Sequence, residues 1–90
     1  MNHFVYLLLT KSKKTYISYV GYTNSLIGRL NKHNNSNGAK FTRGRKWRII
    51  YSKKYYSKSI ALKEEYKLKK DYKKRKKIKK IYLLKHEKTT

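Results

Sequence analysis

The chain has 90 residues, a length that suits one small domain. It contains no cysteine, which excludes disulfides and thiolate metal sites, and 26 Lys and Arg against 4 Asp and Glu give a formal charge of +22. This excess favours a polyanionic partner, usually nucleic acid, although an A/T-rich coding sequence would also enrich lysine.

The N-terminal stretch predicts a β-hairpin. A strand is expected over His3–Thr10, which is rich in β-forming residues, followed by a polar turn and a second strand over Tyr16–Tyr22. The apolar run Phe4–Leu9 is far shorter than the roughly 20 residues that a membrane span needs. It also lacks the basic start and the cleavage site of a signal peptide. We therefore expect an internal strand of a cytoplasmic protein.

A first helix is expected after an N-cap at Asn24, and its pattern fades at Asn34–Asn35. Its spacing places Arg29 and His33 four residues apart, on one face. The segment that follows, residues 34–46, is polar and contains two glycines, so it predicts a loop.

Arginine is concentrated in one part of the chain. Four of the five arginines lie between residues 29 and 48, in a chain that otherwise uses lysine. Because a guanidinium binds phosphates bidentately and an ammonium does not, this cluster indicates phosphate binding better than the lysines do. The predicted nucleic-acid contacts are Lys40, Arg43, Arg45, Arg48 and Lys69.

The rest of the chain predicts one strand and two helices. The strand spans Trp47–Tyr56, and the next helix starts at Ser57 or Ser59 and runs to Lys70. A third helix is expected over Asp71–His86, packed on Ile78, Ile81 and Tyr82, with a frayed end. The expected fold is α+β, a three-stranded, mainly antiparallel sheet flanked by helices in the order β-β-α-β-α-α. Residues 1–78 would form the domain, and residues 79–90 a basic helix end and tail.

One acidic residue is predicted to face inward. At 100° per residue, the apolar arc of the second helix contains Ala61, Leu62, Leu68 and Tyr72. Glu65 lies inside this arc, where a carboxylate is costly unless a metal or a cation compensates it. Spacing alone leaves both interpretations open: a metal ligand, or an ion pair with Lys69 or an arginine.

The ordered motifs resemble the GIY-YIG endonuclease family over Phe4–Lys70. Phe4-Val5-Tyr6 stands at the first motif, with Phe4 in place of glycine, and Tyr19-Val20-Gly21 stands at the second. The family's helix positions are occupied by Arg29, His33 and Glu65. The chain looks most like the small single-domain bacterial branch, which is similar to the catalytic domain of structure-selective flap and Holliday-junction nucleases.

The resemblance implies a metal-dependent endonuclease that cleaves DNA. The enzyme would select its substrate by DNA structure rather than by base sequence, and it would act in repair or recombination. The resemblance also implies that Tyr6 or Tyr19 acts as general base toward water, without deciding which. Arg29 would stabilise the transition state, and Glu65 would be the sole protein ligand of a Mg²⁺ or Mn²⁺ ion. His33 would orient the water or contact a phosphate.

Two other classes compete with the nuclease. A non-catalytic binder of DNA or RNA, for example a ribosome-associated one, suits the size and charge equally well. Such a binder has no chemical reason to assemble Glu65 with the two tyrosines and Arg29, although each of these residues alone has an ordinary structural explanation. A membrane-surface helix would explain only Lys67–Lys85, so no membrane partner is expected. The DNA structure (branched, damaged or single-stranded), the protein partners and the oligomeric state stay open, and we expect the protein to associate with the nucleoid when bound to DNA.

Overall fold

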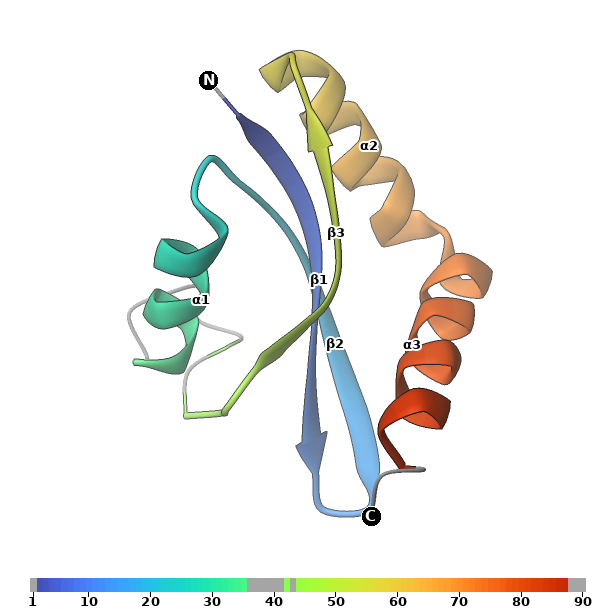
Figure 1. Cartoon of the computed structure of the whole chain (residues 1–90). Coiled ribbons are helices and arrows are strands. Elements are labelled where there is room, and N and C mark those ends of the chain that lie inside the picture. Colours follow the sequence, from blue (N-terminus) through green and yellow to red (C-terminus); the bar gives the residue numbers. More distant parts are fainter. Residues whose placement is uncertain (1, 36–41, 43, 88–90) are drawn as a thin grey trace.

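Three antiparallel strands form one sheet in the order β2-β1-β3 (Figure 1). The computed structural model of the chain describes residues 2–35, 42 and 44–87. The elements in chain order are β1 (His3–Ser12), β2 (Thr15–Thr23), α1 (Leu26–Asn34), β3 (Arg48–Tyr55), α2 (Lys58–Lys70) and α3 (Tyr72–Glu87). The predicted α+β class and the order β-β-α-β-α-α are confirmed.

The central strand is the most apolar one, as its two neighbours require. Val5–Thr10 of β1 is buried throughout, whereas β2 and β3 each leave one edge unpaired within the sheet. A two-residue turn joins β1 to β2, because Ser12 pairs with Thr15. In that turn Lys13 has a φ of 55°, a left-handed conformation that glycine would adopt more readily.

The two faces of the sheet are covered by different helices: α1 lies on one side, and α2 and α3 lie on the other (Figure 1). Successive side chains of a strand point to opposite faces, so β1 contributes to two cores. The core under α2 and α3 is aliphatic and contains Val5, Leu7, Val20, Ala61 and Leu68. The core under α1 contains Tyr6, Leu8 and Trp47.

The junction between α2 and α3 is held by hydrogen bonds at both helix ends. The Asp71 carboxylate accepts from the Lys74 N–H at 3.0 Å and so caps the start of α3. Arg75 then donates to the carbonyls of Leu68 and Lys69, each at 3.0 Å, which satisfies two carbonyls in the last turn of α2. Arg75, the one arginine outside the cluster, therefore fixes the geometry of this junction.

Some details of the sequence prediction are wrong. Ser25, not Asn24, occupies the N-cap position of α1, and its side chain makes no capping bond. Leu62 and Ile81 are 41% and 47% exposed, because the faces of α2 and α3 that touch the sheet are narrower than the predicted arcs. Tyr72, also placed in the arc, is largely exposed.

Other predictions about the helices are confirmed. Ser57 is the N-cap of α2, with its Oγ 3.4 Å from the Ile60 nitrogen, and Ile78 packs on the aliphatic core.

The predicted boundary after residue 78 lies inside α3, and residues 88–90 lie outside the described part. Within the described residues, no helix has the length and hydropathy to cross a membrane.

Candidate active site

A buried chain of hydrogen bonds links β1 to α1 and to the segment before β3. The Tyr6 hydroxyl lies 2.9 Å from His33 Nε2, and His33 Nδ1 lies 2.7 Å from Thr42 Oγ1. These three residues are at most 2% exposed. A neutral imidazole donates at one nitrogen and accepts at the other, which suits a hydroxyl on each side. Both ring nitrogens of His33 thus have protein partners, and His33 holds Tyr6 rather than facing a ligand.

Gly21 provides the space for the Tyr6 ring. It is the cross-strand partner of Tyr6. A Cβ atom at position 21 would lie 2.2 Å from the Tyr6 hydroxyl oxygen, far inside van der Waals contact. The glycine of the second motif is therefore required by the close approach of the phenol of the first.

Thr42 is placed by Trp47 and Asn34, two residues that were not predicted to belong to the site. Trp47 donates from Nε1 to the Thr42 carbonyl at 2.9 Å. Its backbone N–H donates to Asn34 Oδ1 at 2.6 Å, and Asn34 Nδ2 donates back to the Trp47 carbonyl at 3.3 Å. Asn34 at the end of α1 thereby anchors the start of β3. No local pattern points to this, because Asn34 and Thr42 lie in or beside the segment predicted only as a loop.

Tyr19 stands next to this chain at the outer strand β2. Its ring centroid lies 5.2 Å from that of His33 in an edge-on arrangement and 6.5 Å from that of Tyr6. Unlike Tyr6 it is partly exposed, and it lines a cavity of about 300 Å³ together with Ser18, Val20, Lys69 and Arg75. The two tyrosines are therefore adjacent but differ in their access to solvent.

The charges of Arg29 on α1 and Glu65 on α2 both affect the pKa of Tyr6. Burial raises the pKa of Tyr6 well above its ordinary value, and the neighbouring Tyr19 raises it further. Arg29 from α1 lowers the pKa of Tyr6, and Glu65 from α2 raises it. The pKa of His33 is lowered, first by burial and then by Arg29, so this imidazole is held neutral. The five predicted residues thus belong to one electrostatic neighbourhood.

Glu65 is the more enclosed of the two glutamates of α2. Its side chain is 18% exposed and that of Glu64 is 35% exposed. The predicted pairing with Lys69 is present, but it is long, with Nζ 3.8 Å from Oε2. No cluster of three or more His, Asp or Glu side chains occurs in the described part of the chain, so any metal here would have few protein ligands. A single half-buried carboxylate fits Mg²⁺ or Mn²⁺, which keep several waters.

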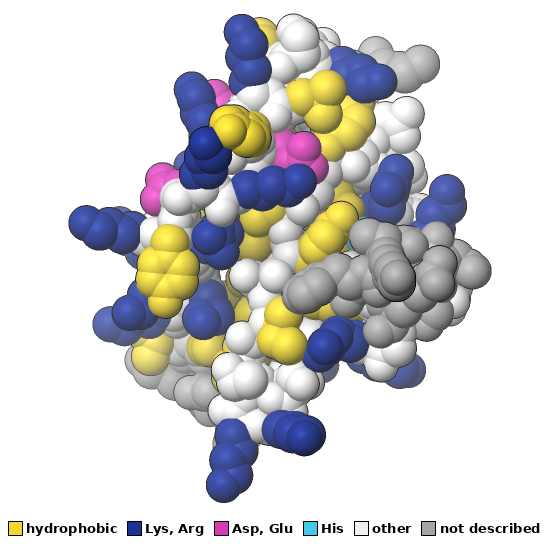
Figure 2. All heavy atoms as spheres, turned by 180° about the vertical axis from the view of Figure 1, so that it is seen from behind, with side chains coloured by type: hydrophobic (Ala, Val, Ile, Leu, Met, Phe, Trp, Pro, Cys, Tyr) yellow, Lys and Arg dark blue, Asp and Glu magenta, His cyan; other side chains and the backbone are white. Residues whose placement is uncertain are grey.

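The predicted nucleic-acid contacts fall in different places. Lys69 lines the cavity that contains Tyr19, whereas Arg45 and Arg48 line a second, larger cavity. Lys40 and Arg43 lie outside the described residues. Figure 2, seen from behind, shows Lys and Arg side chains distributed around much of this face, with the few acidic groups over α2. The cationic surface therefore extends beyond the predicted contacts.

Comparison with known proteins identifies the sequence family. The GIY-YIG catalytic domain family matches residues 2–79. A UPF0213 protein of Oceanobacillus iheyensis is 43% identical over 67 residues, which cover 73% of this chain and 74% of that protein. A UPF0213 protein of Staphylococcus epidermidis is 39% identical over 67 residues, covering 73% and 78%.

One solved structure also resembles the chain. The solution NMR structure of a UPF0213 protein from Bacillus halodurans has a TM-score of 0.48 and 34% sequence identity. The match covers 90% of this chain and 85% of that one. The names of these relatives assign no activity.

Proposed function

The chain belongs to the GIY-YIG catalytic domain family, and we propose that it is a metal-dependent endonuclease that hydrolyses phosphodiester bonds in DNA. The domain places it in a nuclease superfamily and implies a nucleic-acid substrate. The observation that carries the proposal is the convergence of five residues from four elements: Tyr6, Tyr19, Arg29, His33 and Glu65.

The two tyrosines have different tasks in this proposal. Tyr6 is enclosed, is bonded to His33 and has a raised pKa, so it stays protonated at neutral pH. Tyr6 therefore has a positioning role, and its hydroxyl is bonded to His33, which is bonded in turn to Thr42. Tyr19 lines a cavity that is open to water, so we assign the general base to Tyr19: its phenolate would accept the proton of the attacking water and become the neutral phenol.

Arg29 and Glu65 have the electrostatic roles in this proposal. The Arg29 guanidinium stabilises the negative charge that develops on the phosphate oxygens, as cationic groups do in phosphoryl transfer. Glu65 would hold a Mg²⁺ or Mn²⁺ ion, and such an ion would supply positive charge to the scissile phosphate. GIY-YIG nucleases are generally dependent on divalent metals, and one carboxylate is enough for an ion that retains most of its waters.

The basic surface provides affinity without a sequence preference. Phosphate contacts position a protein on DNA but read no bases. We therefore propose selection by DNA structure, in repair or recombination, by a cytoplasmic protein that joins the nucleoid through DNA. No membrane partner is proposed.

A second candidate is a non-catalytic nucleic-acid binder, which the ion pair between Glu65 and Lys69 favours. In that case Glu65 supports the fold and holds no metal. The two candidates predict opposite consequences for one substitution.

Glu65→Gln separates them, with Glu64→Gln as the matched control one residue away. In the nuclease, Glu65→Gln abolishes Mg²⁺-dependent cleavage of labelled branched, damaged and single-stranded DNA, while binding persists and folding survives. Glu64→Gln cuts normally. In the binder, Glu65→Gln lowers the melting temperature and no variant cuts. A Glu65→Gln protein that still cuts with Mg²⁺ would overturn the assignment of the metal ligand.

A further inference from the structure

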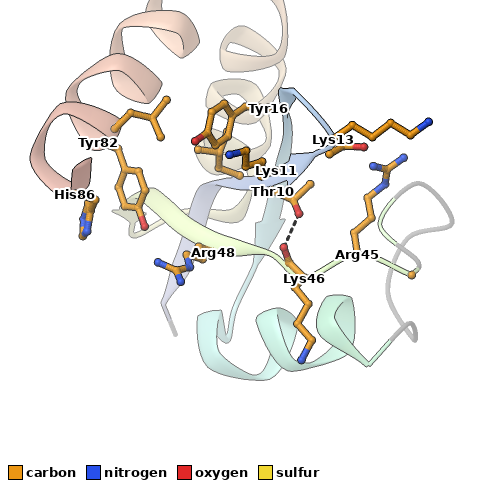
Figure 3. A pocket seen from close by; sticks show the side chains of 13 residues that line it. Thr10, Lys11, Lys13, Tyr16, Arg45, Lys46, Arg48, Tyr82 and His86 are labelled. Carbon is orange, nitrogen blue, oxygen red and sulfur yellow. Dashed lines mark hydrogen bonds between the residues drawn. The ribbon is translucent and has the colours of Figure 1, made fainter. Parts of the chain in front are cut away.

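A large cavity lies away from the candidate active site. It measures about 770 Å³, within the usual range of ligand sites, and none of its lining residues belongs to that site. Figure 3 shows that three segments far apart in sequence bound it: the β1–β2 hairpin, the segment leading into β3, and the end of α3. The hydroxyl of Thr10 donates to the Lys46 carbonyl at 2.5 Å and ties the first two segments together.

The walls of this cavity combine aromatic and apolar surface. Tyr16 comes from β2 and Tyr82 from α3, and Leu9 and Leu83 also line the cavity. Both tyrosines are partly buried, so their rings are held in place rather than extended into solvent. Rings fixed in this way are suited to stack against a flat ligand.

The described part of the cavity lining carries positive charges and no carboxylate. Five of its lining residues are cationic, Lys11, Lys13, Arg45, Lys46 and Arg48, and none of the thirteen described lining residues is acidic. In Figure 3 the side chain of Lys46 points away from the cavity, toward α1, so its ammonium does not contribute to the charge of the cavity. Lys11 Nζ also lies 5.9 Å from the centroid of the Tyr16 ring, so positive charge sits directly beside an aromatic wall. The ligand that matches is both aromatic and anionic, which describes a nucleotide.

We propose that this cavity binds one unpaired nucleotide of single-stranded DNA, with the base against Tyr16 and Tyr82 and the phosphate on Arg48. A paired base cannot enter a cavity, so the nucleotide must be unpaired. The other four cations, Lys11, Lys13, Arg45 and Arg48, still exceed the charge of one nucleotide, and the phosphates of a continuing strand would balance them, which favours DNA over a free mononucleotide. The choice of DNA as partner rests on the proposed function, and the cavity would then direct the nuclease toward DNA with single-stranded segments.

The test uses the full chain and a single-stranded 12-mer of thymidine that carries one 2-aminopurine, in EDTA so that no cleavage occurs. Stacking on tyrosine should quench the 2-aminopurine fluorescence when the DNA binds. Tyr82→Leu keeps an apolar side chain but removes the aromatic face, so it should abolish the quenching and weaken binding by about tenfold. Arg48→Gln should keep the quenching and reduce the slope of log K against log salt by about one.

The matched control is Tyr56→Leu. Tyr56 is 89% exposed and follows β3 at the end opposite the cavity, so its replacement should change neither quenching nor affinity. Circular dichroism verifies that Tyr82→Leu is folded, and Tyr16→Leu repeats the test from another element. Normal quenching in both cavity variants would overturn the proposal, as would displacement of the 12-mer by an equal nucleotide concentration of deoxyadenosine monophosphate. A protein that cuts no DNA but passes these tests would refute the nuclease and leave the cavity assignment intact.

Discussion

The two faces of β1 differ in what they bury. The side chains toward α2 and α3 are aliphatic, with Leu7 fully enclosed, whereas those toward α1 include Tyr6, bonded to His33. One face requires only shape and volume, and the other requires hydrogen-bond partners at defined distances. The same ten-residue strand thus supports the fold on one side and positions polar chemistry on the other, so substitutions on the two faces should affect different measurements.

The largest expected effect lies on the aliphatic face. Leu7→Ala should lower the free energy of unfolding by about 2–5 kcal/mol, because it leaves a cavity in the core that joins the sheet to α2. Chemical denaturation measures this loss. Leu84→Ala removes the same atoms from a side chain that is 52% exposed, and it should change stability by less than about 0.5 kcal/mol. Equal effects of the two substitutions would contradict the assignment of the core.

The next effect lies on the chemical face and concerns rate. Arg29→Lys keeps the charge but loses the planar fork, so it should lower the rate of DNA cleavage by about 10²–10³. Its unfolding midpoint should stay close to that of the wild type. Single-turnover cleavage at saturating DNA separates this loss from weaker binding, and Lys32→Arg on the exposed side of α1 is the control. Near-normal cleavage by Arg29→Lys would remove Arg29 from the site.

The sequence predicted the parts of both faces that depend on local patterns. The strands follow from β-forming residues, and Arg29 and His33 follow from helical spacing after the second motif. The network behind His33 could not be predicted, since Thr42 is held by a bond from Trp47, and Trp47 is bonded in turn to Asn34, thirteen residues earlier in the chain. For His33, spacing predicted only that it shares a helix face with Arg29, and its bonds to Tyr6 and Thr42 come from tertiary contacts.

The sequence pattern also could not predict which apolar side chains of α2 and α3 are exposed. Leu62 and Ile81 have the hydrophobicity of core residues, but α2 buries only Ala61 and Leu68. Helical spacing gives the direction of a side chain and not the width of the contact that the neighbouring sheet offers. Arg75 shows the complementary limit, because its hydrogen bonds across the α2–α3 junction depend on the angle between two helices.

A smaller effect is expected from a substitution at Gly21, the cross-strand partner of Tyr6 in the β1–β2 hairpin. Gly21→Ala puts a methyl group into the Tyr6 phenol, and the buried ring must move away from His33. We expect a loss of about 1–3 kcal/mol in stability and slower cleavage. Gly28→Ala is the matched control, since its Cβ would meet the Ser25 side chain, with the hydroxyl oxygen at 3.0 Å and the Ser25 Cβ at 3.6 Å, and alanine favours the helix. Gly28→Ala should be neutral or stabilising, and the same sign for both variants would contradict the packing described.

The smallest effect is the dependence of stability on pH that His33 imposes. Burial, and then Arg29, lower the pKa of His33 in the folded protein below its ordinary value of 6.5. Between the folded pKa and 6.5 the unfolded chain therefore binds more protons, so stability falls as the pH falls through this window, by at most about 1.4 kcal/mol per pH unit. Below the folded pKa the contribution of His33 levels off. Denaturation series from pH 7.5 to pH 5 should show this loss, and His33→Gln, which keeps a hydrogen-bonding side chain that does not titrate, should flatten it while lowering stability at pH 7.5. His3→Gln is the control, because His3 bonds to Tyr22 outside the Tyr6 network, and it should keep the acid-sensitive step. If His33→Gln retained the full step, the acid sensitivity would belong to other groups and the buried imidazole would not be the neutral partner of Tyr6.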